Sequence, residues 1–293
     1  MASVSVSELK RQLEQCLREL HLPTFREQFE ALAKRAAQES FSYEQYLGEL
    51  ATQECDARRT NRIERWLRES DLPVEKSLAR FDLKRLPATV SRQVRTLVDG
   101  AFVDARENVL AFGRSGSGKT HLLCAIAQEL VRSGRKVLFA PCSLLVQDLL
   151  SAKRELRLKR LLKRLTRFEV LIIDDLGYVQ QSREEMEVLF TLLAERYERG
   201  SVMITSNLPF SKWESIFKDP MTTAAAIDRL VHHSVILELN VPSYRLEEAQ
   251  KGQQASAEKP SSRKEPEHAI QQRAARAKEV KKTTQINDRR REL

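Results

Sequence analysis

The stretch that decides the fold reads Asn108-Val109-Leu110-Ala111-Phe112, followed by Gly113-Arg114-Ser115-Gly116-Ser117-Gly118-Lys119-Thr120. Its second half matches the pattern G-x-x-x-x-G-K-[ST], in which glycines let the backbone N–H groups face inward around a polyphosphate. In this pattern the Lys119 ammonium reaches the β- and γ-phosphates, and the Thr120 hydroxyl can bind magnesium. The stretch therefore predicts a site for a nucleoside triphosphate. The residues assigned to nucleotide binding are Gly113, Arg114, Ser115, Gly116, Ser117, Gly118, Lys119, Thr120 and His121.

The sequence on either side of this loop decides between a phosphate loop and a glycine-rich turn without a ligand. Val109 to Phe112 is a short apolar run typical of a buried strand, and His121 to Arg132 has helical periodicity. A strand before the loop and a helix after it are the context that a phosphate loop requires. This context favours nucleotide binding.

The composition favours a polyanionic partner. The chain of 293 residues carries a net charge of +9, which favours nucleic acid, although charge alone is weak evidence. No apolar run approaches the roughly 18 residues of a membrane span, and the first residues lack the apolar region of a signal peptide. The cysteines Cys16, Cys55, Cys124 and Cys142 form no C-x-x-C pair and are expected to be reduced. We therefore expect a soluble, cytoplasmic protein.

Residues 1–75 are expected to form a small helical domain that contacts DNA or a protein partner. Ser5 begins a capping-box pattern before leucines at helical spacing, a second helix is expected from Phe25 to Gln38, and Ser42 precedes a third from Tyr43 to about Glu69. A solvated helix face is an equally good interpretation of the arginines in the third helix. These are Arg58, Arg59, Arg62, Arg65 and Arg68.

Further along the chain, apolar strands alternate with helices, which is the pattern of an α/β fold with a five-stranded parallel sheet. The predicted strands are Asn108 to Phe112, Lys136 to Ala140, Glu169 to Asp174, Ser201 to Ser206 and Ser234 to Leu239. The predicted helices lie near residues 119–132, 143–166, 183–199 and 222–232. We therefore divide the chain into a helical domain at 1–75, a linker and lead-in at 76–105, a nucleotide domain at 106–248 and a basic, disordered tail at 249–293.

Polar residues at the ends of the third and fourth strands complete the predicted site. Asp174 ends an apolar run, and a carboxylate at that point in a P-loop fold holds magnesium. Asp175 follows, where a second carboxylate can orient the attacking water. Asn207 follows the fourth strand, whose end should lie beside the phosphate loop, so that its amide can hydrogen-bond the γ-phosphate or the water. The alternatives are two turns, one beginning at Asp174 and one at Asn207.

Arg229, shortly before the last strand, is the candidate arginine finger. An arginine in this position often lies on the subunit surface, where it can reach a neighbour's nucleotide and neutralise transition-state charge. An ion pair with Asp228 or another surface acid is the alternative. The adjacent His232 and His233 are not expected to hold a metal, because neighbouring helical residues do not converge and no third ligand has suitable spacing.

A basic stripe is expected on the helix from Ser143 to about Leu165. Cations recur there at steps of three or four residues, so they share one helix face. In an oligomer this face would line a groove or pore for the DNA backbone, with contacts insensitive to sequence and strongly dependent on salt. A solvated face is the alternative. The residues assigned to DNA are Lys153, Arg157, Arg160, Lys163 and Arg164.

Six segments together carry a family resemblance: GRSGSGKTH, VLIIDDLGY, SREEMEVLFTLLAERYERGS, VMITSNLPFSKWESIF, AAAIDRLVHHS and PSYRLEE. The chain resembles the IstB-type ATPases, the transposition helper proteins of insertion sequences, from about residue 8 to residue 247. These are AAA+ proteins close to the DnaC helicase loaders and the DnaA initiators. The resemblance implies a AAA+ P-loop domain without a separate helical lid and ATP with Mg²⁺ as cofactors. It also implies that Asp175, Asn207 and Arg229 are the catalytic carboxylate, the sensor-1 residue and the arginine finger.

The resemblance further implies ATP-dependent oligomers, as rings or spirals, that bind duplex DNA largely without sequence preference and help a separate transposase act. We therefore expect an ATPase stimulated by DNA and by its oligomer or partner, and not a strand-cleaving transposase. One alternative is a DnaC-like loader, whose partner is a replicative helicase and whose preferred DNA is single-stranded. Another is a non-catalytic adaptor that uses ATP only to hold its structure, although the intact Lys119, Thr120, Asp174 and Asp175 argue against it.

Overall fold

The computed structural model describes residues 5–178, 182–217, 220–244 and 246–247. The chain divides into two compact units, residues 1–243 and 244–293, and every helix and strand named below belongs to the first. The tail predicted at 249–293 lies outside the described residues. Among the helices of the described ranges, none combines the length and the apolar character needed to cross a bilayer.

Three helices open the chain, as the sequence predicts. They are α1 (Val6–Glu19), α2 (Pro23–Glu39) and α3 (Tyr43–Glu69). At the start of α3 the Ser42 and Gln45 side chains form a reciprocal capping box with each other's backbone. The leucines predicted for one face of α1 are less buried than expected. Leu17 is buried, whereas Leu9, Leu13 and Leu20 are exposed.

Glu54 joins α2 to α3. Only 3% of this residue is exposed, and its carboxylate accepts hydrogen bonds from the Thr24 N–H at 2.9 Å and from Arg58 Nε at 2.7 Å. Burial opposes ionisation of this carboxyl, but the hydrogen bonds from Arg58, Thr24 and Phe25 together hold the pKa of Glu54 below its ordinary value. The carboxylate thus caps the N-terminus of α2, where the helix dipole favours a negative charge.

Residues 76–105 contain more structure than the predicted linker and lead-in. They form the 3-10 turns η1 (Leu78–Arg80) and η2 (Leu83–Arg85) and the helices α4 (Ala88–Val98) and α5 (Ala101–Asp104). The apolar side chains of these elements belong to the core of the sheet: Leu86, Val90, Val94, Leu97, Phe102 and Val103. The buried residues of α4, Val90, Val94 and Leu97, therefore pack against the nucleotide domain.

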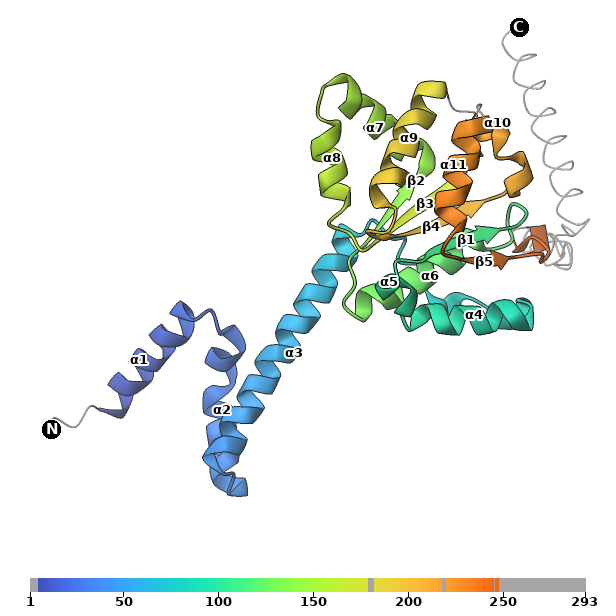
Figure 1. Cartoon of the computed structure of the whole chain (residues 1–293). Helices are drawn as coiled ribbons and strands as arrows, with labels where there is room; N and C mark the ends of the chain where they lie inside the picture. The colour runs from blue at the N-terminus through green and yellow to red at the C-terminus, as the bar shows by residue number, and fades with distance from the viewer. Residues whose placement is uncertain (1–4, 179–181, 218–219, 245, 248–293) are drawn as a thin grey trace, which may run out of the picture. The chain divides into compact units, whose positions relative to one another are not determined.

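A five-stranded parallel sheet lies at the centre, as predicted (Figure 1). Its strands are β1 (Asn108–Phe112), β2 (Val137–Pro141), β3 (Val170–Leu176), β4 (Ser201–Ser206) and β5 (Ser234–Glu238), in the order β2-β3-β4-β1-β5. Phe112 pairs with Ser206, and Ile173 pairs with Ile204. The carboxyl ends of β1, β4 and β3 are therefore adjacent, at the edge where open α/β sheets bind ligands.

Alternation along the strands divides the core into two halves, because successive side chains of a strand point to opposite faces. Val109 and Ile172 face the cluster made with α4, α5 and α6 (Lys119–Arg132). Leu110 and Ile173 face the cluster made with the helices α7 (Cys142–Arg154), α8 (Leu158–Leu165), α9 (Arg183–Arg196) and α11 (Pro220–Val231). Figure 1 shows the two sets of helices on opposite faces of the sheet. This is a three-layer α/β arrangement.

The helices of the second face are α7 (Cys142–Arg154), α8 (Leu158–Leu165), α9 (Arg183–Arg196) and α11 (Pro220–Val231). The short elements η3 (Phe210–Lys212) and α10 (Glu214–Phe217) lie between β4 and α11. The predicted ends of the last two helices differ from the observed ends by a few residues, as is usual for helix termini.

The prediction of one unbroken helix from Ser143 to Leu165 is wrong. The chain leaves helical geometry between α7 and α8, where Leu156 has φ of +57° and is 94% exposed. In a continuous helix the buried face of Leu149 would recur at positions near 160 and 163, which are basic here. The helix therefore breaks, and α8 turns the face bearing Leu161 onto the core.

Candidate active site

The loop Gly113–Thr120 joins β1 to α6 and adopts a backbone that requires glycine. Gly116 and Gly118 have φ of +79° and +93°, a region that strains residues with a Cβ. Close neighbours add a second reason. A Cβ at Gly116 would clash with Ser243 Oγ, and one at Gly118 would lie 3.1 Å from Phe81 Cε2.

The Lys119 ammonium lies inside the loop. The residue is 5% exposed, and its Nζ donates to Gly113 O at 2.8 Å and to Arg114 O at 3.0 Å. Ser117 Oγ is also buried there and has no hydrogen-bond partner among the described residues. A cation and an unsatisfied hydroxyl within a glycine-rich loop fit a nucleotide, because its phosphates supply acceptors for both.

One hydroxyl connects the carboxylate of Asp174, predicted to bind magnesium, with the backbone of Asp175, predicted to act in hydrolysis. Thr205 Oγ1 on β4 donates to Asp174 Oδ1 on β3 at 2.6 Å and accepts from the Asp175 N–H at 2.8 Å. Asp175 has φ of +59° and lies where the register of β3 against β4 shifts. This bulge re-aims the second carboxylate, so that Asp174 is buried and Asp175 is exposed.

Thr120 and Asp174 are the residues that would hold magnesium. Mg²⁺ takes oxygen ligands and is usually bound through one or two carboxylates together with substrate phosphates. A hydroxyl at the start of α6 and a carboxylate at the end of β3 match that donor set. The part of the chain that the structure describes contains no cluster of three His, Cys, Asp or Glu side chains that could hold a metal without a nucleotide. The donors therefore fit a magnesium ion that binds with the triphosphate.

The end of β4 lies beside the phosphate loop, which is the geometry that the assignment of Asn207 requires. Asn207 is exposed and follows Ser206, which pairs with Phe112 at the entrance to the loop. Thr205 receives no role in the sequence-based prediction, although it begins the polar triplet Thr205-Ser206-Asn207. Its signal in the sequence is a hydroxyl near the end of a strand expected to lie next to the strand of Asp174.

Phe81 is a second residue that the sequence-based prediction leaves without a role. Its ring meets the His121 ring edge to face, with centroids 5.2 Å apart, and it lies against Gly118. His121 Nε2 is 3.1 Å from Ser77 O. The segment from Ser77 to Phe81 therefore forms a wall at the start of α6, with an aromatic ring beside the phosphate loop.

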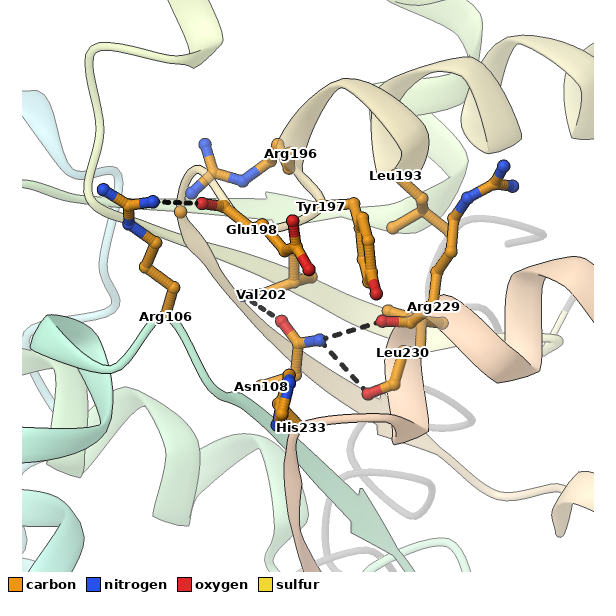
Figure 2. Close-up of a pocket in the computed structure, with 11 residues that line it drawn as sticks. Arg106, Asn108, Leu193, Arg196, Tyr197, Glu198, Val202, Arg229, Leu230 and His233 are labelled. Carbon is orange, nitrogen blue, oxygen red and sulfur yellow. Dashed lines mark hydrogen bonds between the residues drawn. The ribbon is translucent and has the colours of Figure 1, made fainter.

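Arg229 lies near the amino end of β1, whereas the phosphate loop follows the carboxyl end of the same strand. Asn108, at the start of β1, donates from Nδ2 to Arg229 O at 3.5 Å and to Leu230 O at 3.1 Å, and accepts from the Val202 N–H at 2.9 Å (Figure 2). The loop begins at Gly113, about 15 Å further along β1 at the usual rise of a strand. The backbone of Arg229 is therefore far from its own chain's phosphate loop.

The guanidinium of Arg229 rests on Phe190 of α9, with Cζ 4.7 Å from the ring centroid. Figure 2 shows the side chain pointing away from Asn108. Its Nη1 is buried without a hydrogen-bond partner, and within the described ranges no carboxylate forms an ion pair with it. The surface ion pair with Asp228, the alternative raised by the sequence, is not formed there.

The residues assigned to DNA separate into two groups. Lys153 pairs with Glu187 at 3.3 Å, and Arg157 pairs with Glu155. Arg160, Lys163 and Arg164 on α8 are exposed, and no carboxylate pairs with them in the described part of the chain. The break between α7 and α8 therefore divides the predicted stripe into a paired half and an unpaired half.

Arg196 fixes the end of α8. This arginine of α9 is 2% exposed, and its guanidinium donates to the carbonyls of Leu165, Phe168, Glu169 and Ser201 at 2.9 to 3.1 Å. Desolvation by burial lowers the pKa of Arg196 to about 10, so it still carries its charge at neutral pH. It binds the last carbonyl of α8, Leu165 O, where a cation is favoured by the helix dipole.

The matching family and two relatives are all described as IstB-like or insertion-sequence ATP-binding proteins. The family described as IstB-like ATP binding protein matches residues 15–252. An insertion-sequence ATP-binding protein of Sinorhizobium fredii is 42% identical over 230 residues, which are 78% of this chain and 77% of that protein. The IS21 ATP-binding protein of Pseudomonas aeruginosa is 38% identical over 240 residues, which are 82% and 91% of the two chains. The solved structure of DnaA from Aquifex aeolicus has a TM-score of 0.50 at 15% identity, covers 67% of this chain and 59% of its own, and shares the fold alone.

The Thr205 bridge generates a test of the site. Replacing Thr205 by valine keeps the shape but removes the hydroxyl that Asp174 and the Asp175 N–H share, so ATP hydrolysis should fall by about 10- to 100-fold while ATP binding changes little. Thr205→Ser restores the hydroxyl and should recover most of the rate. Steady-state hydrolysis and binding of a fluorescent ATP analogue measure both quantities. Equal rates for Thr205→Val and the unaltered protein would remove Thr205 from the mechanism.

Proposed function

The chain belongs to the family of IstB-like ATP binding proteins, and on this premise we propose that it is a AAA+ ATPase of DNA transposition. It assembles on duplex DNA when ATP is bound, recruits or activates a separate transposase, and resets on hydrolysis. The fold with its central parallel sheet is that of the AAA+ proteins. Beyond membership of the family, we propose ATP hydrolysis, assembly into oligomers and binding of duplex DNA.

The arrangement at the carboxyl ends of β1, β3 and β4 supports ATP hydrolysis. The phosphate loop holds Lys119, and the magnesium ligands Thr120 and Asp174 belong to the elements beside it. When bound, magnesium would neutralise phosphate charge. Asp175, exposed next to Asp174, orients the attacking water, and Asn207 contacts the γ-phosphate or that water.

The observation that carries the oligomeric part of the proposal is the position of Arg229. Its backbone lies near the edge of the sheet opposite its own phosphate loop, and its guanidinium rests on Phe190 without an acidic partner within the described ranges. A cation held in this way suits a phosphate supplied by a second subunit. Arg229 therefore completes a neighbour's site, and hydrolysis depends on assembly.

The unpaired cations of α8 support binding to the DNA backbone. Arg160, Lys163 and Arg164 are exposed, whereas Lys153 on α7 and Arg157, the residue before α8, already contact carboxylates. An anchored cation without a protein counter-ion gains most from a phosphate, because no existing pair has to break. The contact is with backbone phosphates, so it is insensitive to sequence and weakens with salt.

Two substitutions separate nucleotide binding from turnover. Lys119→Ala removes the cation that contacts the β- and γ-phosphates and should weaken ATP binding by about a hundredfold. Asp175→Asn removes the carboxylate but not the fold, so ATP binding should persist while turnover falls by about 10²- to 10⁴-fold. Calorimetry with ATP and a phosphate-release assay distinguish the two effects. Normal turnover by Asp175→Asn would exclude the role given to that residue.

Subunit mixing tests whether Arg229 acts on a neighbour. Arg229→Ala should lose about 10³-fold or more of its hydrolysis, and Asp175→Asn should lose about 10²- to 10⁴-fold. In an equal mixture, roughly a quarter of the interfaces would join an intact Asp175 to an intact Arg229, so activity should return to about that share of the unaltered rate. If Arg229 acts within its own chain, every subunit still lacks one group and the mixture stays inactive.

A competition between long duplex DNA and single-stranded DNA, with ATP present, tests the DNA partner. We expect strong preference for duplex, whereas preference for single strands would favour the helicase-loader alternative. Arg160→Glu on α8 should weaken duplex binding by roughly tenfold or more at moderate salt. The matched control Arg157→Glu, which reverses a cation already paired with Glu155, should have a smaller effect. Equal effects of the two reversals would contradict the assignment to α8.

A further inference from the structure

A cavity of about 330 Å³ lies between α3 and the turn that joins α6 to β2, and no residue of the phosphate loop or of α8 lines it. The turn is open. Gly134 has φ of +100°, and a Cβ placed on it would meet no atom within 4 Å. The residues that line the cavity are Arg59, Arg62, Ile63, Trp66, Ser133 and Gly134.

Two cations contact the ring of Trp66, which lines this cavity. Arg62 Cζ is 5.7 Å from the centroid of the Trp66 ring, and Lys136 Nζ is 5.5 Å from it. Both distances are within the range of cation–π attraction, so the ring attracts both positive charges. The indole Nε1 is itself buried and donates to no acceptor among the described residues.

The cations at the cavity are distinguished from their neighbours by lacking counter-ions. Arg58 pairs with Glu54 at 2.7 Å, and Arg135 pairs with Asp104 at 2.7 Å and with Glu169 at 3.0 Å. Over the described residues, no carboxylate forms an ion pair with the two arginines that line the cavity or with the lysine that contacts Trp66. These are Arg59, Arg62 and Lys136.

The end of α6 does not oppose an anion here. A helix C-terminus normally exposes carbonyls that repel negative charge. In this turn the Ser133, Gly134 and Arg135 N–H groups donate to carbonyls in the last turns of α6 at 2.9 to 3.0 Å, and the Ser133 hydroxyl donates at 2.8 Å to Leu130 O, which also accepts from the Arg135 N–H. The side-chain cations therefore dominate the field in the cavity.

We propose that this cavity is a second DNA-binding site, which takes a phosphodiester of the duplex backbone between Arg59, Arg62 and Lys136. A phosphate supplies acceptors for the guanidinium groups and for the lysine ammonium. Arg59 and Arg62 are one helical turn apart, about 4.5 Å along the axis of α3, and so suit a polymer with closely repeated charges. The inference rests on the proposed function, because it adds a contact to the same DNA.

A backbone phosphate suits this cavity better than an acidic peptide. Carboxylates would also pair with arginine, but a single subunit presents two separate sets of unpaired cations, one at the cavity and one on α8. One long polyanion can engage both sets, and each engaged phosphate adds to the release of counter-ions that drives binding. The N-terminal helices would then hold the same DNA as the nucleotide domain.

Charge reversal in the full-length protein tests this site. The double variant Arg59→Glu/Arg62→Glu should weaken binding of a fluorescent long duplex by about tenfold or more at roughly 0.1 M salt, and should lower the slope of log affinity against log salt by about two. The control Arg26→Glu, at an exposed position on α2, should change neither quantity appreciably. Unchanged circular dichroism and ATP binding establish that both variants are folded.

Tryptophan fluorescence supplies a local readout. The chain has two tryptophans, and Trp213 is fully buried, so quenching by DNA should come from Trp66 and disappear in Trp66→Phe. The quenching should persist in Arg160→Glu at DNA concentrations that saturate that variant.

The outcomes separate this inference from the proposed function. If the unaltered protein binds duplex and the double variant binds it equally well, the cavity is not a DNA site, and the proposed function stands. Loss of transposase binding in the double variant, with DNA binding intact, assigns the cavity to a protein and also overturns the inference. Failure of the unaltered protein to bind duplex removes both.

Discussion

The position of β4 between β1 and β3 is the constraint on which the nucleotide site depends. Because β4 pairs with both, the end of the strand that carries the phosphate loop and the end of the strand that carries Asp174 are separated by one strand. Thr205 fills that interval, since its hydroxyl bonds Asp174 and the Asp175 N–H at once. The bulge at Asp175 then turns a second carboxylate out of the sheet beside the first.

Helix α9 connects the surface assigned to DNA with the candidate finger. Its Glu187 contacts Lys153 of α7, its Phe190 supports the guanidinium of Arg229, and its Arg196 binds Leu165 O at the end of α8. On the proposed function, α9 therefore contacts α7, the end of α8 and the candidate finger.

Local patterns made much of this structure predictable. The phosphate loop, the five strands and the capped start of α3 each follow from residues close together in the sequence, and each is found where predicted. The break at Leu156 was missed because helical spacing of the basic residues continues across it, and only the changed phase of the leucines marks it. Thr205 could not be assigned from spacing alone, because its role depends on which strand lies beside β4. The sequence predicts residues 76–105 only as a linker and lead-in, since prolines interrupt the segment, and its short helices emerge from the structure, where their apolar residues pack in the core.

Because Arg229 is separated from its own phosphate loop, the proposed interface joins two different surfaces. One subunit contributes its phosphate loop, and its neighbour contributes Arg229. Such head-to-tail contacts either close into a ring or continue as a filament. On the proposed arrangement, a closed ring completes every nucleotide site. An open assembly always leaves one uncapped loop at one end and one unused arginine at the other. Its terminal subunits would then differ chemically although their sequences are identical, which gives the assembly a direction along the DNA and an end at which nucleotide is retained.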